Sequence, residues 1–524
     1  MRVYSSLTPP GSSIPGFLRG TPKPHLFLDS RFPLVFHLSL AVRQETGTIA
    51  VGGRRMRDDE YRIERDSLGE VKVPADCLWG AQTERSRQNF PIGVGHEQMP
   101  QEIIHAFGYL KKACALANGD LSPKMTKEKM DAIVEASEEI LSGMLDDQFP
   151  LVVFQTGSGT QTNMNVNEVI AHVANARAHR SLLHPNDDVN LSQSSNDTFP
   201  SAMHIAIVLE VERSLLPAMD EVIRVLKEKE AENAGIMKSG RTHLMDAVPV
   251  AFSQEISGWR AALEEDRAML VEALDHVRQL AVGGTAVGTG LNAPEGFDKA
   301  VCRYISTFTG TRFIPAENKF RALTMLDDVV AVHGVIKASA MDMMKMANDV
   351  RWMASGPRNG LGEIRIPANE PGSSIMPGKV NPTQCEQVTM VAVQILGNDA
   401  AVSFASSQGN FELNTYLPVS AYNVLQSIRL LADSMRTFAA RCLAGMEARK
   451  ETMENNLRRS LMLSTLLSPV IGYARAAEAA QKADRENCTL KEACLSLGYL
   501  DGETFDALFA PFLKPENESP EGEK

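Results

Sequence analysis

The chain has 524 residues and a mass of 57.2 kDa, with 53 Lys and Arg against 65 Asp and Glu, which gives a net charge of −12. This length suits two to four domains or one extended architecture with a large core. The acidic balance leaves no electrostatic footprint for a nucleic acid, so we expect no such partner. Seven scattered cysteines without a CxxC pair, and histidines without HExxH spacing, predict a reducing compartment, no metal and no cofactor.

Residues 1–55 differ from the rest of the chain, because they hold seven Lys and Arg, only two acids and many Pro, Gly and Ser. An organelle transit peptide has such a composition and would indicate a mitochondrial protein. We favour a disordered extension or a non-native start, with translation from Met56 and a cytoplasmic location. The longest apolar run, residues 32–42, is shorter than the roughly 18 residues of a membrane span, so we expect no membrane partner.

Residues 56–193 mix loops with helices predicted at 101–120 and 126–145. Within this region, residues 155–168 (QTGSGTQTNMNVNE) resemble a phosphate-cradling loop but lack the Lys of a P-loop. Backbone N–H groups and hydroxyls suit a carboxylate equally well. A helix start capped by Ser or Thr is the structural alternative, and we would favour it if this loop stood alone.

Residues 192–200 (SQSSNDTFP) come immediately before a long helical tract. Ser194, Ser195 and Asn196 can cap that helix or donate hydrogen bonds to an anion at its N-terminus. On spacing alone, capping is the favoured interpretation.

Long helical tracts follow from residue 194 onward, and a short C-terminal part has smaller helices. The long tracts are predicted at 201–232, 252–281, 326–353, 385–405 and 418–446. The tract 326–353 is apolar on more than one face, which indicates burial within a bundle or between subunits. Because alternating strand patterns are almost absent, we predict an all-α fold with a central bundle of five long helices. The predicted domains are 56–193, 194–450 and 451–524, the last with a polar tail.

Two loops interrupt these tracts. Residues 240–246 (GRTHLMD) place His243 beside an Arg and a Thr after a Gly, where general acid–base service is plausible although a lone His is usually structural. Residues 283–290 (GGTAVGTG) suggest a dinucleotide loop, but they follow a helical tract without a βαβ pattern, so this interpretation is weak.

The most informative loop comprises residues 369–382 (NEPGSSIMPGKVNP), hereafter the lid loop. Glycines and prolines permit close backbone approach and fix bends. Between them stand two hydroxyls, one cation and one amide. This is the equipment of a mobile lid that carries a base and closes over a carboxylate.

Together these strings resemble one family. From about residue 62 to 510 the chain is similar to the class II, metal-independent fumarases of the fumarase/aspartase superfamily. The shared strings are VPAD (73–76), LWGAQT (78–83), the loops above, FIPAENKF (313–320) and NPTQCE (381–386). Gly378, Thr383 and Gln384 are fumarase-like, whereas aspartases resemble PAKVNP followed by VVPE.

The resemblance implies reversible hydration of fumarate to (S)-malate by an aci-carboxylate mechanism, in the tricarboxylic acid cycle. It makes Ser373 the base, His243 its partner on the oxygen side and Glu386 the carboxylate that orients His243. We hypothesise that Lys379 and backbone N–H groups of the lid loop stabilise the Ser373 alkoxide.

The resemblance also implies a homotetramer whose active sites are each shared by three subunits. The implied substrate-binding residues are Ser158, Gly159, Thr160, Ser194, Ser195, Asn196, Thr242, Ser374, Lys379, Val380 and Asn381. A second dicarboxylate site is implied at His184, Pro185, Asn186 and Asp187. This chain departs from the family there, because Ser181 stands where an Arg is usual and Arg180 lies one position earlier.

Two alternatives remain. An ammonia lyase acting on aspartate shares the base and the intermediate, but Gly378, Thr383 and Gln384 argue against it. A catalytically inactive scaffold homologue, of the kind known among lens crystallins, is disfavoured because every expected catalytic position holds the expected residue type.

Overall fold

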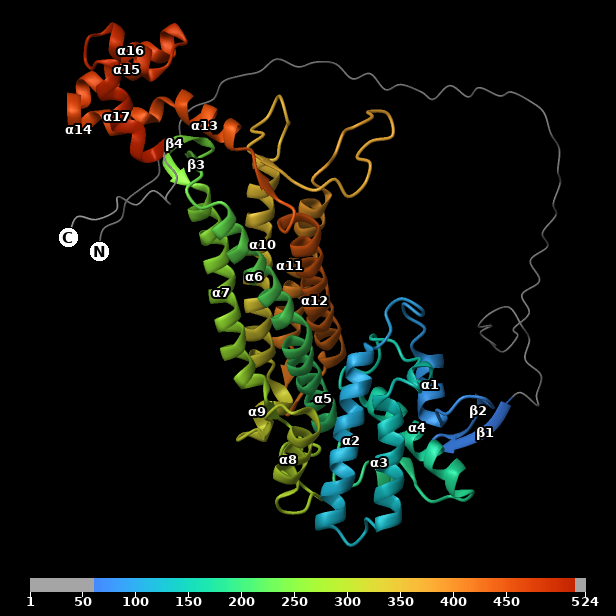
Figure 1. Ribbon diagram of the computed structural model, residues 1–524. Coiled ribbons are helices and arrows are strands. Elements are labelled where there is room, and N and C mark those ends of the chain that lie inside the picture. Colours follow the sequence, from blue (N-terminus) through green and yellow to red (C-terminus); the bar gives the residue numbers. More distant parts are fainter. Residues whose placement is uncertain (1–60, 514–524) are drawn as a thin grey trace, which may run out of the picture. The chain divides into compact units, whose positions relative to one another are not determined.

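The computed structural model describes residues 61–513, and the predictions for residues 1–55 and for the polar tail lie outside them. The described chain is all-α, with helices α1 to α17 and only short strands (Figure 1). Its N-terminal part begins with the antiparallel hairpin β1 (Tyr61–Asp66) and β2 (Gly69–Pro74). The helical elements that follow are α1 (Ala81–Asn89), α2 (Gln101–Leu121), α3 (Lys127–Leu141), η2 (Asp146–Gln148), α4 (Thr160–Ala178) and the π-helix η3 (Pro185–Val189).

Five long helical rods form the central bundle. The first rod is continuous through α5 (Ser195–Glu210), the π-helical turn η4 (Val211–Leu215) and α6 (Leu216–Glu232). The others are α7 (Phe252–Val277), α10 (Asp327–Met353), α11 (Thr383–Ser406) and α12 (Leu417–Phe438), which ends in the π-helix η5 (Ala439–Leu443). Contacts run in a ring from α6 to α7, α10, α11, α12 and back to α6. The predicted five-helix bundle is confirmed.

Shorter elements connect the rods and close the ends of the bundle. They are β3 (Met237–Thr242), β4 (Met245–Ala251), β5 (Gln279–Leu280), α8 (Phe297–Thr309), β6 (Ile314–Pro315), α9 (Lys319–Thr324), β7 (Ile364–Arg365), β8 (Gly409–Asn410), β9 (Leu413–Asn414) and β10 (Glu447–Ala448). The sequence analysis missed the antiparallel pairs β1–β2 and β3–β4. It also missed that β5 precedes residues 283–290 and pairs in parallel with β6, although both strands have only two residues.

The C-terminal part has a hydrophobic cluster of its own. It contains α13 (Lys450–Arg459), η6 (Leu461–Leu463), α14 (Ser464–Ile471), α15 (Tyr473–Glu486), α16 (Leu490–Ser496) and α17 (Gly502–Leu513). Leu467, Ala479 and Cys494 are among its buried residues. The N-terminal part and the bundle share one continuous core. The predicted three-domain division stays a prediction.

Helix α11 is long and apolar enough to cross a membrane, by length and composition alone, over an 18-residue window of mean hydropathy 1.4. The sequence analysis had identified no such run. Only 33% of that window is buried within this chain. The exposed apolar side chains include Met390 (66% exposed), Val393 (62%) and Phe404 (66%). A bundle helix with such a face requires a further covering surface.

Candidate functional site

The N-termini of α4 and α5 meet around three hydroxyl groups, which we call the hydroxyl cluster: Ser158, Thr160 and Ser195. Oγ1 of Thr160 lies 2.8 Å from Oγ of Ser158 and 2.8 Å from Oγ of Ser195. Gly159 caps α4 at φ 72°, and a Cβ there would lie 2.0 Å from the Phe199 ring, so only glycine fits. Helix N-termini and hydroxyls together form an environment suited to a carboxylate.

The start of α5 is fixed from both sides. Ser194 caps it in a capping box with Asp197, so the favoured capping interpretation is confirmed for Ser194. The Asn196 amide donates to the carbonyl of Ala286 (2.8 Å). The buried Asp197 carboxylate accepts from the backbone N–H groups of Gly283 and Thr285, at 2.9 Å each. The glycine-rich loop 283–290 therefore packs against the start of α5.

The carboxyl group of Asp197, in the first turn of α5, is buried. Burial raises the pKa of Asp197 to about 6, against the lowering effect of the backbone hydrogen bonds that it accepts. Thr285 stands opposite at φ 56°, a left-handed conformation that is strained for a β-branched residue. Such strain persists only where surrounding contacts impose it, and here the Asp197 contacts do so.

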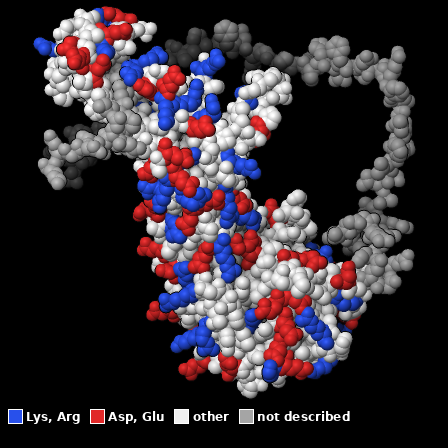
Figure 2. Space-filling view, in the orientation of Figure 1, with Lys and Arg blue, Asp and Glu red and all other residues white. Residues whose placement is uncertain are grey.

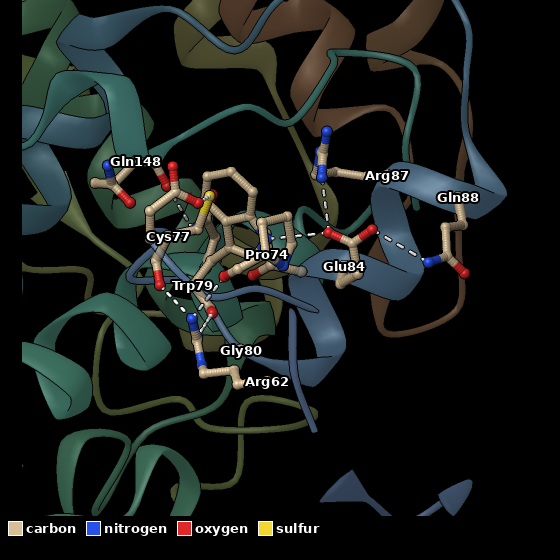
Figure 3. A network of polar contacts seen from close by, with 12 residues as sticks. Arg62, Pro74, Cys77, Trp79, Gly80, Glu84, Arg87, Gln88 and Gln148 are labelled. Carbon is tan, nitrogen blue, oxygen red and sulfur yellow. Dashed lines mark hydrogen bonds and ion pairs between the residues drawn. The ribbon is translucent and has the colours of Figure 1, made fainter. Parts of the chain in front are cut away.

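A network of polar contacts surrounds Trp79 at the start of α1 (Figure 3). Arg62 donates to the carbonyls of Pro74 (2.9 Å) and Cys77 (2.5 Å), and Glu84 accepts from the Trp79 indole at 3.1 Å. Behind them, the Glu168 carboxylate of α4 accepts from the backbone N–H groups of residues 80, 82 and 83 at the start of α1. This motif therefore holds α4, and with it the hydroxyl cluster, in place.

Thr242 and His243 lie at the tip of the β3–β4 hairpin. His243 and Leu244 form its two-residue turn at φ 57° and 62°, the positive values of a type I′ turn. Both Thr242 and His243 are exposed. A bidentate ion pair from Arg241 to Glu363, at 2.6 and 2.9 Å, fastens the hairpin to the segment that leads into the lid loop.

The lid loop folds back on itself. The backbone N–H of Gly372 donates to the carbonyl of Lys379 (2.9 Å), and the Asn381 amide donates to the carbonyl of Gly372 (2.8 Å). Oγ of Ser373 accepts from the backbone N–H groups of Ile375 (3.3 Å) and Met376 (3.1 Å). Donors to this oxygen stabilise its anionic form. Within residues 61–513, the ammonium group of the exposed Lys379 makes no hydrogen bond or ion pair.

The structure does not bring all predicted site residues together in one chain. The hydroxyl cluster lies at the start of the rod α5–η4–α6, and the hairpin follows its end (Figure 1). That rod runs from Ser195 to Glu232, and a helix of this length spans about 57 Å. Glu386, exposed in the first turn of α11, makes no hydrogen bond or ion pair with His243 in the described part of the chain.

The predicted second site is a separate exposed turn. His184 caps η3, and its Nδ1 accepts from the backbone N–H groups of Asn186 (3.3 Å) and Asp187 (3.2 Å). Arg180, one position from the place where the family carries its arginine, forms an ion pair with Glu128. The second site stays a prediction.

Lys111 and Glu363 are buried charged residues that the sequence analysis missed. Lys111 stands on the apolar face of α2, between the buried residues Leu110 and Cys114. A lysine at an apolar position of a predicted helix is the sequence signal that could have identified it. Glu363 is next to a two-residue strand, and its partners are distant in sequence, so no local pattern marks it.

No group of three or more His, Cys, Asp and Glu is placed to hold a metal ion among residues 61–513. Two surface cavities, of about 340 and 550 Å³, lie near the C-terminal end of α6, and none of the predicted site residues lines them. On the face drawn in Figure 2, acidic and basic side chains are interspersed.

The fold and these residue groups define a lyase: a family model described as Lyase matches residues 69–397, and one described as Fumarase C C-terminus matches residues 463–513. The chain is 59% identical over 460 residues to the class II fumarate hydratase of Staphylococcus aureus (strain MRSA252), covering 87% of this chain and 98% of that protein. It is 58% identical over 456 residues to that of Oceanobacillus iheyensis, covering 86% and 98%. The chain belongs to the class II fumarate hydratase family.

Solved structures agree with this assignment. The class II fumarase from Schistosoma mansoni superposes with a TM-score of 0.85 at 42% identity, covering 88% of this chain and all of that one. A fumarate lyase:delta crystallin from Brucella melitensis in native form gives a TM-score of 0.80 at 39% identity, covering 87% and 100%. The predicted fumarase/aspartase-like all-α fold is confirmed.

Proposed function

We propose that this chain catalyses the reversible addition of water to fumarate, giving (S)-malate, in the tricarboxylic acid cycle. The carrying observation is membership of the class II fumarate hydratase family over 87% of the chain, with every predicted catalytic and binding residue inside the matched regions. We place the enzyme in the cytoplasm, where its cysteines, all free among the described residues, stay reduced.

In the direction from malate to fumarate, the Ser373 alkoxide takes a proton from the carbon beside one carboxylate, and the electron pair moves into that carboxylate. The resulting aci-carboxylate then expels the hydroxyl group of the neighbouring carbon as His243 donates a proton to it, and water leaves. Proton exchange with solvent returns both residues to their starting states. Preorganised donors must meet the charge that develops on the carboxylate.

The lid loop supplies part of this preorganisation. The N–H groups of Ile375 and Met376 already point at Oγ of Ser373, as stabilisation of an alkoxide requires. The ammonium of Lys379 adds the positive charge once the loop closes over substrate. The remaining binding residues hold the two substrate carboxylates; they are Ser158, Gly159, Thr160, Ser194, Ser195, Asn196, Thr242, Ser374, Val380 and Asn381.

The working unit in this proposal is a homotetramer in which each active site takes residues from three subunits. Two observations support it. The hydroxyl cluster and His243 lie at the two ends of a rod about 57 Å long, so one chain cannot close a site around a four-carbon acid. Helix α11 also exposes Met390, Val393 and Phe404, an apolar face that neighbouring subunits would cover.

The activity is tested by following the absorbance of the conjugated double bond after adding (S)-malate or (S)-aspartate separately. Fumarate from malate alone is the expected result, whereas fumarate from aspartate alone would assign the chain to the ammonia lyases. Ser373→Ala should lower kcat by about three orders of magnitude or more, the scale of losing an essential base. Ser496→Ala, in the C-terminal part, is the matched control and should retain native kcat.

The sharing of sites is tested by mixing two inactive variants, Ser373→Ala and His243→Asn, under conditions that exchange subunits. If each site takes these residues from different subunits, about a quarter of the sites in a random 1:1 mixture regain both native residues. Activity near a quarter of the native value supports the proposal. A mixture as inactive as its components, with exchange demonstrated, would place both residues in one subunit's site.

A further inference from the structure

Lys111 is a fully buried cation that the proposed mechanism does not use. It lies in the middle of α2 with 0% of its surface exposed. Its Nζ donates to three amide oxygens, on Asn163 (2.8 Å), Gln193 (2.9 Å) and Asn190 (3.2 Å). No carboxylate lies within ion-pair distance of it in the described chain. Neutral amides satisfy the hydrogen bonds of an ammonium without cancelling its charge.

Those amides belong to the segments that build the hydroxyl cluster. Asn163 is one turn into α4 after Thr160, and its Oδ1 also accepts from Oγ1 of Thr198 in the first turn of α5 (3.0 Å). Gln193 immediately precedes Ser194, the cap of α5. The ammonium therefore contacts side chains from both segments that carry the hydroxyl cluster, one in the first turns of α4 and one immediately before the cap of α5.

Burial makes this position unfavourable for a charge, and it lowers the pKa of Lys111 to about 8, so the group is still mainly charged at neutral pH. The titratable groups that face it are Asp197 of α5 and Cys114 of α2 itself. Burial keeps the Cys114 thiol neutral, because it raises its pKa well above the ordinary value. Asp197 is the only one of the two that can oppose the Lys111 charge near neutral pH.

We propose that Lys111 is a positioning residue for substrate: its buried charge, which no direct ion pair neutralises among the described residues, acts through Asn163 and Gln193 and favours binding of a dicarboxylate's carboxylate at the hydroxyl cluster. This inference rests on the proposed function, because it assumes that the cluster holds a substrate carboxylate. The charge of Lys111 affects binding affinity. Its loss should therefore change KM and the inhibition constant of a saturated four-carbon dicarboxylate. The value of kcat depends on Ser373 and His243 instead.

The first test replaces Lys111 by Met, which keeps the length of the side chain and removes its charge. The expected result is an increase of about tenfold or more in KM for (S)-malate and in the inhibition constant of succinate, with a much smaller change in kcat. Lys112→Met is the matched control, because this neighbour on α2 pairs with Glu138 over the Phe308 ring and not with the cluster. Its KM should stay native.

A second variant separates charge from structural support. In Asn190→Asp, an oxygen that already contacts Nζ becomes part of a carboxylate, so the ammonium keeps its contacts while its charge is cancelled. Asn190→Asp also removes the hydrogen bond that Nδ2 donates to the Gln193 carbonyl (3.2 Å). A structural role limited to the contacts of the ammonium predicts near-native KM for this variant, and the proposal predicts the same increase as for Lys111→Met. Asn190→Asp also decides the question if Lys111→Met fails to fold.

The unaltered enzyme gives a third readout. As pH rises through about 8, Lys111 loses its proton and KM should rise, and this rise should be absent from Lys111→Met. Native KM in a folded Asn190→Asp enzyme, or the same alkaline rise in folded Lys111→Met, would overturn the proposal. Loss of the proposed function is distinguishable, because the native enzyme would then show no fumarate formation at any pH.

Discussion

Replacing Glu363 by Gln should destabilise the end of the bundle that carries His243. Glu363 is 0% exposed and holds three elements together. It accepts two hydrogen bonds from Arg241 of β3, lies 3.5 Å from Nζ of Lys238 of the same strand, and accepts from Asn456 of α13 (3.3 Å). Lys238 also pairs with Glu255 of α7 (3.0 Å). The amide of Gln cannot neutralise Arg241 or accept both of its hydrogen bonds.

Removing one partner of a buried ion pair costs about 3–5 kcal/mol, because the other charge stays buried without compensation. Unfolding entropies of about 2 cal/mol/K per residue give about 1 kcal/mol/K for some 450 residues, so a loss of 4 kcal/mol lowers the apparent Tm by about 4 °C. Because Glu255 still pairs with Lys238 in the variant, we expect the loss of stability to lie in the lower half of the range of about 3–5 kcal/mol.

The effect depends on pH with a defined sign. Burial by itself raises the pKa of the Glu363 carboxyl, but the hydrogen bonds from Arg241 and the charge of Lys238 outweigh it and hold that pKa below its ordinary value. The folded state therefore binds fewer protons than the unfolded state near the ordinary pKa of 4.5. The stabilisation is complete above that pH and is lost as pH falls through the folded-state pKa.

The assay compares thermal unfolding of the native enzyme and Glu363→Gln between pH 4 and 8, with Glu447→Gln as control. Glu447 pairs with Arg365 at 3.9 Å in the same region, but the two side chains are 69% and 74% exposed, so its loss should shift Tm by under about 1 °C. The difference between native enzyme and Glu363→Gln should narrow toward the acid end. Equal Tm values for both variants at neutral pH would refute the reasoning.

Three further predictions concern the site and the assembly. Gly159→Ala should raise KM and lower Tm, because its Cβ meets the Phe199 ring at 2.0 Å and its φ is 72°; native values for both would show that α4 and α5 separate without cost. Val393→Glu, on the exposed face of α11, should reduce both tetramer content and activity when measured by sedimentation and turnover. Prolonged chelation should leave activity unchanged, and a loss that added metal restores would contradict the assignment to class II.

Much of the bundle could be predicted because its helices depend on local apolar spacing. The tract predicted at 326–353 is α10 at Asp327–Met353, and the tract predicted at 252–281 is α7 at Phe252–Val277. The tract predicted at 418–446 ends earlier as an α-helix, because the π-helix η5 takes over at Ala439. The spacing of apolar residues predicts where a helix lies more reliably than it predicts the residue at which the helix ends.

The β3–β4 hairpin could not be predicted in this way. Its first strand (MKSGRT) is polar and contains a glycine, and its turn residues, His243 and Leu244, lack the Asn-Gly signal of a type I′ turn. Contacts distant in sequence hold it instead, since Arg241 and Glu363 are 122 residues apart. The predicted catalytic histidine therefore lies on an element that only tertiary structure reveals.

The residue types of the candidate site were predictable, whereas their grouping was not. Local strings predicted the hydroxyls at 158–160 and 194–196 separately, and the structure shows that Thr160 and Ser195 contact each other. Nothing local indicated that Asn163 and Gln193 share one buried ammonium behind them. Contacts between helices determine such grouping, and a single helix does not encode them.

The position of the site groups also links assembly to chemistry. The hydroxyl cluster lies at one end of the α5–η4–α6 rod, and the hairpin and lid loop lie at the other. In the proposed tetramer, antiparallel packing of two copies would bring the cluster end of one rod beside the hairpin end of the other. The exposed apolar face of α11 is the surface that we propose for that packing. If the proposed assembly is right, a substitution on α11 removes activity without touching a catalytic residue, because each site would depend on that packing.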